Sequence, residues 1–217
     1  MGSCTVFWAA PVADAPHLLD LLDAHERRRL TRLRREIDRA RYLAAHALAR
    51  LALAAVVVAD PGALAFDRTC RCGEQHGKPR LPGGGPAFSL THAGDLVGVA
   101  VHDEPVGLDV EQVRPLTDLA AMAAHACAPT ETAPDAAAFF RLWTRKEAVL
   151  KATGDGLSAP MSDLTLGDRR VEHWVDAPGP IWLHDLEPAP GHPAAVAGLG
   201  VAAPPVVEVD GNALLQR

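Results

Sequence analysis

The first part of the chain has a long stretch in which hydrophobic residues recur at helical spacing. From residue 17 to residue 59, Leu and Ala dominate this pattern, which predicts two helices with a break between residues 30 and 37. Pro61 and Gly62 follow and are typical of a helix end. A short apolar run at residues 5–9, ahead of the helices, predicts a strand.

The middle of the chain changes to short apolar runs separated by turn residues. Residues 67–86 are rich in Gly, Pro and Cys and are expected to form a loop. After this loop the pattern predicts three strands, at residues 87–90, 96–101 and 106–111.

Helices and strands alternate again in the second half. A helix is predicted at residues 117–127, and Asp135 is the expected N-cap of another helix that runs to Lys151 and ends at Gly154 and Gly156. Strands are then predicted at residues 171–175, 181–186 and 194–201.

Helices followed by strands therefore occur twice, once in each half of the chain. This order predicts an α+β protein with two similar lobes in one chain. We place an N-terminal lobe at residues 1–107 and a C-terminal lobe at residues 108–217.

Composition limits the functional classes. Hydrophobic residues make up 48% of the 217 residues, which allows a packed core, and the net charge of −6 argues against a general nucleic-acid binder. Eight of the 21 basic residues nevertheless lie between Arg27 and Arg41. Such a local basic face suits a compact anionic ligand or an acidic protein surface, although a solvated helix face would look the same.

The sequence also gives indications of where in the cell the protein is located. The apolar run at residues 42–58 contains His46 and Arg50 and is too short to span a bilayer comfortably, so we expect no membrane segment. Four cysteines in a chain of this length do not indicate a disulfide scaffold. The N-terminus has no visible secretory signal, and we expect a cytoplasmic protein.

Two acidic residues share one predicted strand. Asp109 and Glu111 are two positions apart, so both carboxylates can project from the same face. Paired carboxylates repel each other unless a cation lies between them, and such hard oxygen ligands suit Mg²⁺. On this evidence alone, an exposed polar strand face remains the alternative.

A second cluster lies on the predicted helix that begins after Asp135. Trp143, Glu147 and Lys151 are spaced four apart and form one stripe, which Phe139 and Phe140 help to make largely apolar. One interpretation is an ion pair at the edge of the core. The other is a carboxylate directed at the same metal as Asp109 and Glu111, with Lys151 reaching a phosphate oxygen.

Two further segments offer anion contacts. Lys78, Pro79 and Arg80 follow a glycine on a predicted turn, and Thr91 and His92 end a predicted strand. Neither segment is specific by itself.

The order and spacing of these segments resemble the 4′-phosphopantetheinyl transferases, in the large, pseudo-dimeric type that activates peptide and polyketide synthetases. The resemblance rests mainly on a Gly-x-Asp-x-Glu segment followed by Trp-x-x-Lys-Glu-Ala, at residues 107–111 and 143–148. It extends from the arginine-rich helix to the predicted strand at residues 194–201.

The resemblance implies two α+β lobes with coenzyme A and the metal in the cleft between them. It implies that Mg²⁺ is held by Asp109, Glu111 and Glu147, and that the catalytic residues are Glu147, Lys151 and Glu111. Coenzyme A contacts are implied for Arg29, Arg41, Lys78, Pro79, Arg80, Thr91, His92 and Lys151.

The implied reaction transfers phosphopantetheine from coenzyme A to a serine of an acyl or peptidyl carrier protein, as in secondary-metabolite biosynthesis. The base that deprotonates the serine is left open between Glu147 and a water held by the metal cluster. Because the cleft would lie within one chain, we expect a monomer.

Three alternatives compete with this interpretation. Cys70, Cys72 and His76 could belong to a zinc site, but the Cys-x-Cys spacing is poor and a fourth ligand is not evident. A carrier-binding module without catalysis is disfavoured because all three carboxylates and Lys151 are present. A different magnesium phosphotransferase is disfavoured because the sequence has no Walker or kinase signature.

Overall fold

The computed structural model describes residues 2–13, 15–70, 73–75, 77–156 and 159–216. The chain divides into two compact units. Unit 1 comprises Met1–Asp103 and Val207–Arg217, and unit 2 comprises Glu104–Val206. Both units combine helices with β-sheet, so the predicted α+β class is confirmed.

Unit 1 is built on a four-stranded sheet of order β2-β3-β1-β9. Its strands are Ala87–Ala93 (β2), Leu96–His102 (β3), Cys4–Ala9 (β1) and Val206–Asp210 (β9). Strands β2 and β3 form an antiparallel hairpin, and β1 pairs antiparallel with β3, with Phe7 opposite Val99. The apolar alternation of these strands places Phe88, Val97 and Val99 in a buried core.

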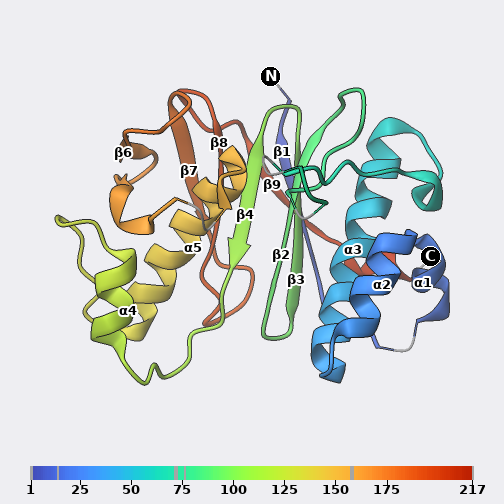
Figure 1. Cartoon of the computed structure of the whole chain (residues 1–217), viewed down its shortest axis with the longest axis horizontal. Helices are drawn as coiled ribbons and strands as arrows, with labels where there is room; N and C mark the ends of the chain where they lie inside the picture. Colours follow the sequence, from blue (N-terminus) through green and yellow to red (C-terminus); the bar gives the residue numbers. More distant parts are fainter. Residues whose placement is uncertain (1, 14, 71–72, 76, 157–158, 217) are drawn as a thin grey trace. The chain divides into compact units, whose positions relative to one another are not determined.

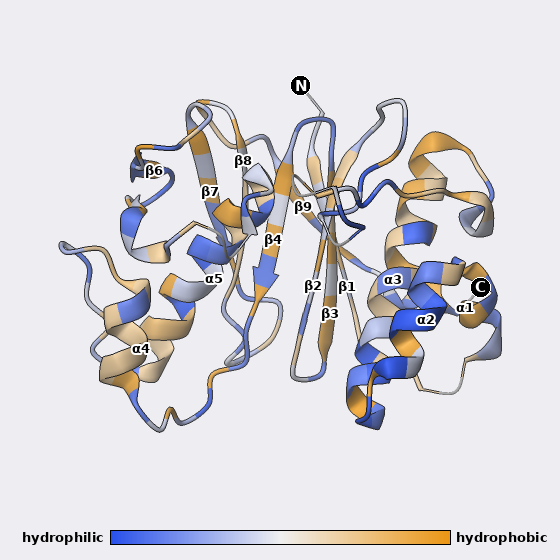
Figure 2. Cartoon of the chain, in the orientation of Figure 1, coloured by the Kyte–Doolittle hydropathy of each residue, from blue (hydrophilic) through white to orange (hydrophobic). Residues whose placement is uncertain are grey.

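The helices of unit 1 pack beside this sheet (Figure 1). They are Pro16–Leu21 (α1), Ala24–Arg32 (α2), Glu36–Val57 (α3) and Asn212–Leu215 (α6), with a 3₁₀ turn at Pro61–Ala63 (η1). Helix α3 supplies most of the helical core, including Leu43, Leu48 and Leu53. Helix α2 is largely hydrophilic (Figure 2) and begins at a capping box formed by Asp23 and Glu26.

A buried ionic network joins α2, α3 and the segment after η1. Arg50 of α3 is fully buried and donates to Glu26 at 2.8 Å and to Asp23 at 3.0 Å. Arg68 donates to the same two carboxylates at 2.9 Å, and His46 Nδ1 lies 3.0 Å from Glu26. Buried charges are tolerated when they are paired and hydrogen-bonded in this way. The network explains why an arginine interrupts an otherwise apolar helix.

Helix α3 also meets the length and composition of a membrane-spanning helix, but 67% of its most apolar window is buried inside the protein. The core helix of a water-soluble protein passes the same test. Its packing against the sheet of unit 1 accounts for its apolar character.

Unit 2 contains a three-stranded antiparallel sheet of order β4-β8-β7. The strands are Val106–Val110 (β4), Ala194–Leu199 (β8) and Ile181–Leu186 (β7), and Thr165–Leu166 (β5) pairs with Val171–His173 (β6) in a separate ribbon. Helix α5 (Ala136–Thr153) packs on the sheet, and α4 (Leu119–Ala126) packs on α5 (Figure 1). A 3₁₀ turn, η3, spans Met161–Asp163.

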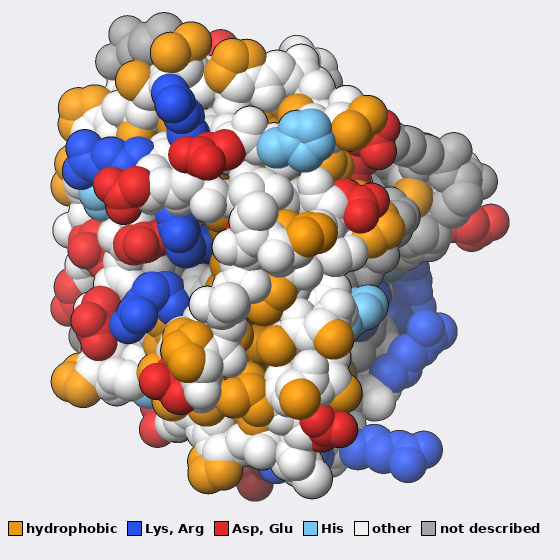
Figure 3. All heavy atoms as spheres, turned by 90° about the vertical axis from the view of Figure 1, so that its left-hand side faces the viewer, with side chains coloured by type: hydrophobic (Ala, Val, Ile, Leu, Met, Phe, Trp, Pro, Cys, Tyr) orange, Lys and Arg blue, Asp and Glu red, His pale blue; other side chains and the backbone are white. Residues whose placement is uncertain are grey.

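The face of unit 2 that is turned to the viewer in Figure 3 has a mixed surface. Acidic and basic side chains lie side by side along the left of this view, and a group of hydrophobic side chains lies in its lower middle part, at the level of α4. Beneath this face, Phe139, Phe140, Leu150 and Leu183 belong to the buried core of the unit.

Most predicted elements are present, with shifted ends. The break near residues 30–37 is confirmed, because α2 ends at Arg32 and α3 begins at Glu36, but the first predicted helix is divided into α1 and α2 by the N-cap Asp23. The second helix does not reach Pro61, since Val58 already adopts a left-handed conformation. The predicted strand at residues 171–175 is shorter, and β9 was not predicted.

The C-terminal segment also differs from the expected division at residues 107 and 108. Strand β9 pairs in the sheet of unit 1, where Trp8 Nε1 donates to Glu208 at 2.8 Å. The end of the chain therefore belongs with the N-terminal unit rather than with the second half.

Candidate active site

Strand β4 meets helix α5 at a glycine. A Cβ atom at Gly107 would lie 2.0 Å from the carbonyl oxygen of Ala148 and 2.4 Å from the backbone nitrogen of Ala152. Because alternate strand residues point to one face, Asp109 and Glu111 face the same helix as Gly107. The glycine thus permits a close approach that brings the side chains of α5 beside the strand carboxylates.

Helix α5 carries Glu147 and Lys151, the other two residues predicted for the active site. Asp135 caps its N-terminus by accepting from the backbone of Ala138 at 2.8 Å, and Gly154 ends it with φ of 81°. Both predicted helix signals are confirmed. Glu147 and Lys151 lie one turn apart on this helix, and Trp143, one turn earlier, packs in the core of unit 2.

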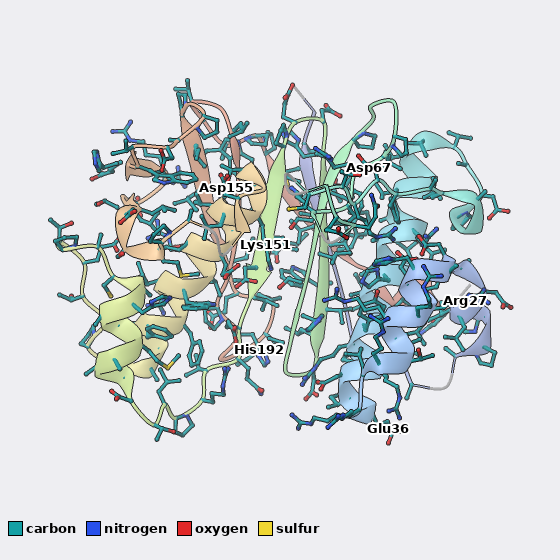
Figure 4. The ribbon with its side chains drawn as sticks, viewed as in Figure 1. Arg27, Glu36, Asp67, Lys151, Asp155 and His192 are labelled. Carbon is teal, nitrogen blue, oxygen red and sulfur yellow. The ribbon has the colours of Figure 1, made fainter. Side chains whose placement is uncertain are left out.

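Lys151 contacts the strand directly. Its Nζ atom donates to Oδ1 of Asp109 at 2.6 Å and to the carbonyl oxygen of Leu108 at 3.1 Å. The Asp109 side chain is 9% exposed and that of Lys151 is 29% exposed. Figure 4 shows Lys151 at the place where α5 passes β4. The ammonium therefore lies at the edge of a mostly buried carboxylate and remains reachable by solvent.

Glu111 has a basic neighbour of its own. The backbone of Glu111 continues the pairing of β4 by donating to the carbonyl of Pro193 at 3.0 Å. Its carboxylate lies 3.1 Å from Nη1 of Arg114, whose guanidinium also lies over the Phe140 ring at 4.6 Å. Stacking on a buried ring holds Arg114 against the carboxylate.

The three carboxylates share one electrostatic environment. Burial raises the pKa of Glu147, and the negative charges of Asp109 and Glu111 raise it further, against the opposing charge of Lys151. Burial likewise raises the pKa of Glu111, with Asp109 adding to the effect and Arg114 opposing it. In both cases burial of the carboxylate is the main cause of the raised pKa, and repulsion by the neighbouring carboxylates adds to it.

Two of these carboxylates form ion pairs with basic side chains. Asp109 is bound by Lys151 and Glu111 by Arg114. Within the described part of the chain, no three His, Cys, Asp or Glu side chains are grouped closely enough to hold a metal ion as they stand. The arrangement is a charged cluster in which two cations face three acids.

Apart from Lys151, the residues predicted to contact coenzyme A lie in unit 1. Arg41 of α3 donates from Nε to the carbonyl of Gly94 at 2.7 Å, and so reaches the β2–β3 turn just after Thr91 and His92. Thr91 is buried and His92 is exposed, because consecutive strand residues point to opposite faces. Arg29 is exposed on α2.

The segment with Lys78, Pro79 and Arg80 is anchored at its end. Arg80 forms a backbone bridge with Asp67, and its guanidinium lies 3.3 Å from the Asp67 carboxylate. The structure thus brings Arg41 to the β2–β3 turn and fixes Arg80 on Asp67. Of the zinc candidates, Cys72 and His76 lie outside the described residues, so that alternative is not tested.

Comparisons with known proteins bear on this cluster. A family model described as "4'-phosphopantetheinyl transferase superfamily" matches residues 105–191, which include both strand carboxylates and the whole of α5. The chain is also 32% identical over 204 residues to the 4′-phosphopantetheinyl transferase HetI of Nostoc sp., covering 88% of this chain and 84% of that protein. The chain belongs to the 4′-phosphopantetheinyl transferase family.

Other relatives carry the same description. A 4′-phosphopantetheinyl transferase of Bacillus subtilis is 28% identical over 158 residues, covering 69% of this chain and 67% of that protein. A phosphopantetheinyl transferase of Thraustochytrium sp. is 30% identical over 205 residues, covering 84% of this chain and 67% of that protein. The resemblance found in the sequence is confirmed, and the chain is a transferase.

Sequence reasoning missed several residues that build this transferase site. Gly107 was quoted within the motif, but its close contact with α5 was not foreseen. Arg114 was not singled out, although its spacing of three from Glu111 could have suggested an ion pair. Lys146, which precedes Glu147 in the motif, was given no role and is fully buried.

Proposed function

We propose that this transferase moves the 4′-phosphopantetheine group of coenzyme A onto a serine of an acyl or peptidyl carrier protein and releases 3′,5′-ADP. Its family supports this reaction. The single structural observation that carries it is the contact of Lys151 with Asp109, beside Glu111 and Glu147, because it joins both halves of the motif in one charged cluster.

We further propose that Asp109, Glu111 and Glu147 hold Mg²⁺. The donor set fits this cation, since three clustered carboxylates are hard oxygen ligands. The electrostatics fit as well, because a divalent cation would offset the repulsion that adds to burial in raising the pKa values of Glu111 and Glu147. When bound, Mg²⁺ supplies positive charge that neutralises the pyrophosphate oxygens of the substrate.

The side chains of the cluster then have distinct tasks. Lys151 is partly exposed and directs its ammonium at the carboxylates, so it can also donate to a pyrophosphate oxygen. The serine proton is accepted either by Glu147 or by a water held beside the carboxylates. Glu111 is kept in place by Arg114.

The coenzyme A contacts in unit 1 form a separate part of the proposal. We assign this role to Arg29, Arg41, Lys78, Pro79, Arg80 and His92, which are exposed or half-buried, and to the buried Thr91. Arg29 belongs to a run of exposed arginines on α2 and after it, which favours an anionic ligand. We also propose that units 1 and 2 correspond to the two lobes of the pseudo-dimeric type, because each combines a β-sheet with one long helix.

The setting of the reaction follows from the same proposal. We expect a cytoplasmic monomer that serves carrier proteins of polyketide or peptide synthetases. The hydrophobic side chains at the level of α4 in Figure 3 offer a surface on which a carrier could dock.

The intact mass of a carrier protein tests the proposed function. The transferase is incubated with coenzyme A, Mg²⁺ and each of several apo-carriers, together with a carrier whose acceptor serine is replaced by alanine. We expect a gain of one phosphopantetheine group only on carriers that keep the serine. A catalytically inactive carrier-binding module would instead retain the carriers without any gain in mass, and this result would overturn the proposal.

A further inference from the structure

Lys146 is a fully buried charge at the centre of unit 2. Its side chain is 0% exposed, and its ammonium contacts four acceptors. Three are backbone carbonyls, of Ala126 at 2.7 Å, Met161 at 2.9 Å and Leu164 at 2.7 Å. The fourth is the carboxylate of Glu131.

Both carboxylate oxygens of Glu131 also accept hydrogen bonds. The carboxylate oxygen that meets Lys146 also accepts from the backbone of Ala128 at 2.8 Å, and the other oxygen accepts from the backbone of Leu166 at 2.9 Å. The pair therefore ties α5 to the end of α4, to residues 128–131, to η3 and to β5. Each of these segments is held by hydrogen bonds rather than by apolar contact alone.

The donors of Lys146 are fully used. An ammonium group has three N–H donors, and four acceptors already surround this one. Lys151, on the next turn, differs because its side chain is 29% exposed. Lys146 therefore has no donor left for a phosphate, even though it is the neighbour of Glu147 in sequence.

We propose that Lys146 and Glu131 are positioning residues for the transfer reaction, which fix Glu147 by holding α5 against α4 and residues 128–131. This inference rests on the proposed function. Consecutive helix residues point about 100° apart, so anchoring Lys146 on one side sets the direction in which Glu147 leaves the helix.

Stability alone does not explain such a pair. A buried ion pair is weak evidence for stabilisation, and replacement of both charges together is often tolerated by the fold. Removal of one charge leaves the other unpaired, which is far more damaging. A double substitution therefore separates the geometric role of the pair from its effect on folding.

The experiment compares Lys146→Met, the double variant Lys146→Met/Glu131→Gln and Leu183→Ala as a stability control. Leu183 lies in the core of unit 2 on β7, and it is not a member of the Lys146 network. Kinetics are measured at a temperature at which thermal melting shows every variant to be folded. We expect the double variant to lose about 10- to 100-fold in kcat, since small misplacements of reacting groups have effects of this size. The KM for coenzyme A should change less than about threefold, and Leu183→Ala should keep the wild-type kcat.

Two kinetic results would overturn the inference. A wild-type kcat in the double variant would show that the pair only stabilises the fold. A large rise in the KM for coenzyme A at unchanged kcat would show that Lys146 binds phosphate.

Hydrogen exchange provides a readout that does not depend on activity. In the double variant, the amides of Ala128 and Leu166 should exchange at least about tenfold faster, because they lose their charged acceptor, while β7 keeps its protection. Unchanged exchange at both amides would refute the positioning role. If the wild-type protein modifies no carrier, the proposed function fails, and hydrogen exchange still decides whether the pair holds these segments.

Discussion

The Nζ atom of Lys151 lies 2.6 Å from Oδ1 of Asp109, so a lysine of α5 forms an ion pair with a carboxylate of β4. Arg114 forms a similar ion pair with Glu111, with 3.1 Å between Nη1 and Oε2. The cluster thus holds three acids and two bases before any substrate is bound, and it has a net negative charge at the point where we propose that Mg²⁺ binds. Binding of coenzyme A pyrophosphate would give Lys151 a second anionic partner.

Removal of a cluster carboxylate should stop the reaction without unfolding the protein. We expect Asp109→Ala and Glu147→Ala each to lower kcat/KM by about 10²- to 10³-fold or more, because each removes charge that stabilises the transition state. Steady-state transfer assays and circular dichroism check this. Asp176→Ala removes an exposed acid from the same unit and should have no effect. Full activity in both cluster variants would refute the metal assignment.

The close approach of β4 and α5 predicts a large effect of a single methyl group. In Gly107→Ala the new Cβ would collide with backbone atoms of Ala148 and Ala152, which cannot move unless the helix moves. We expect a loss of about 2–4 kcal/mol in the free energy of unfolding and a loss of activity. Urea denaturation measures the first. Gly62→Ala is the matched control, because its Cβ would meet nothing closer than 3.4 Å, and equal stability loss in both variants would contradict the account.

The ionic network of unit 1 predicts acid sensitivity. Burial alone would raise the pKa of Glu26, but the hydrogen bond from His46 and the charges of His46 and Arg50 outweigh it and hold the pKa below its ordinary value. Asp23 also has a lowered pKa, because bonds from the Glu26 backbone and Arg68 outweigh its burial. A depressed folded-state pKa adds stability above the unfolded-state pKa, and this stability is lost as the pH falls through the folded-state pKa.

We therefore expect the free energy of unfolding to fall steeply below about pH 4, where ordinary carboxyl groups titrate. Urea denaturation at a series of pH values measures this slope. Asp23→Asn should make the slope shallower. An identical slope in the variant would show that the network does not set the acid limit.

The end of α3 carries conformational strain that a glycine would relieve. Val58 has φ of 54°, a left-handed conformation that β-branched residues rarely adopt, and it is 90% exposed. We expect Val58→Gly to raise stability by about 0.5–1 kcal/mol, because glycine is the usual residue at this position after a helix. Val57→Gly, one residue earlier and still helical, should instead destabilise by about 1 kcal/mol. Thermal melting of the two variants checks the opposite signs.

Local signals predicted the elements whose ends depend on local chemistry. Asp135 and Gly154 bound α5 as expected, since a cap and a left-handed glycine act on their own helix. The strands that form the β2–β3 hairpin were predicted from short apolar runs separated by turn residues, which are also local signals. The carboxylates of the candidate site were found because a strand and a helix each have a fixed side-chain period.

Long-range pairing could not be predicted in this way. Strand β9 joins the sheet of unit 1 through contacts such as that between Trp8 and Glu208, and no local pattern names the partner of a strand. The role of Lys146 was hidden for a similar reason, because its acceptors come from segments up to 20 residues away in sequence. In the sequence Arg50 interrupts an apolar helix, and only the folded structure shows that Asp23 and Glu26 neutralise its charge.

The intact mass of an apo-carrier, measured after incubation with coenzyme A and either Mg²⁺ or a chelator, tests the central claim most directly. Wild-type protein with Mg²⁺ should add one phosphopantetheine group to the carrier, while the chelator and the Glu147→Gln variant should each suppress this addition. An unchanged carrier mass with wild-type protein and Mg²⁺, or equal addition by Glu147→Gln, would contradict the account.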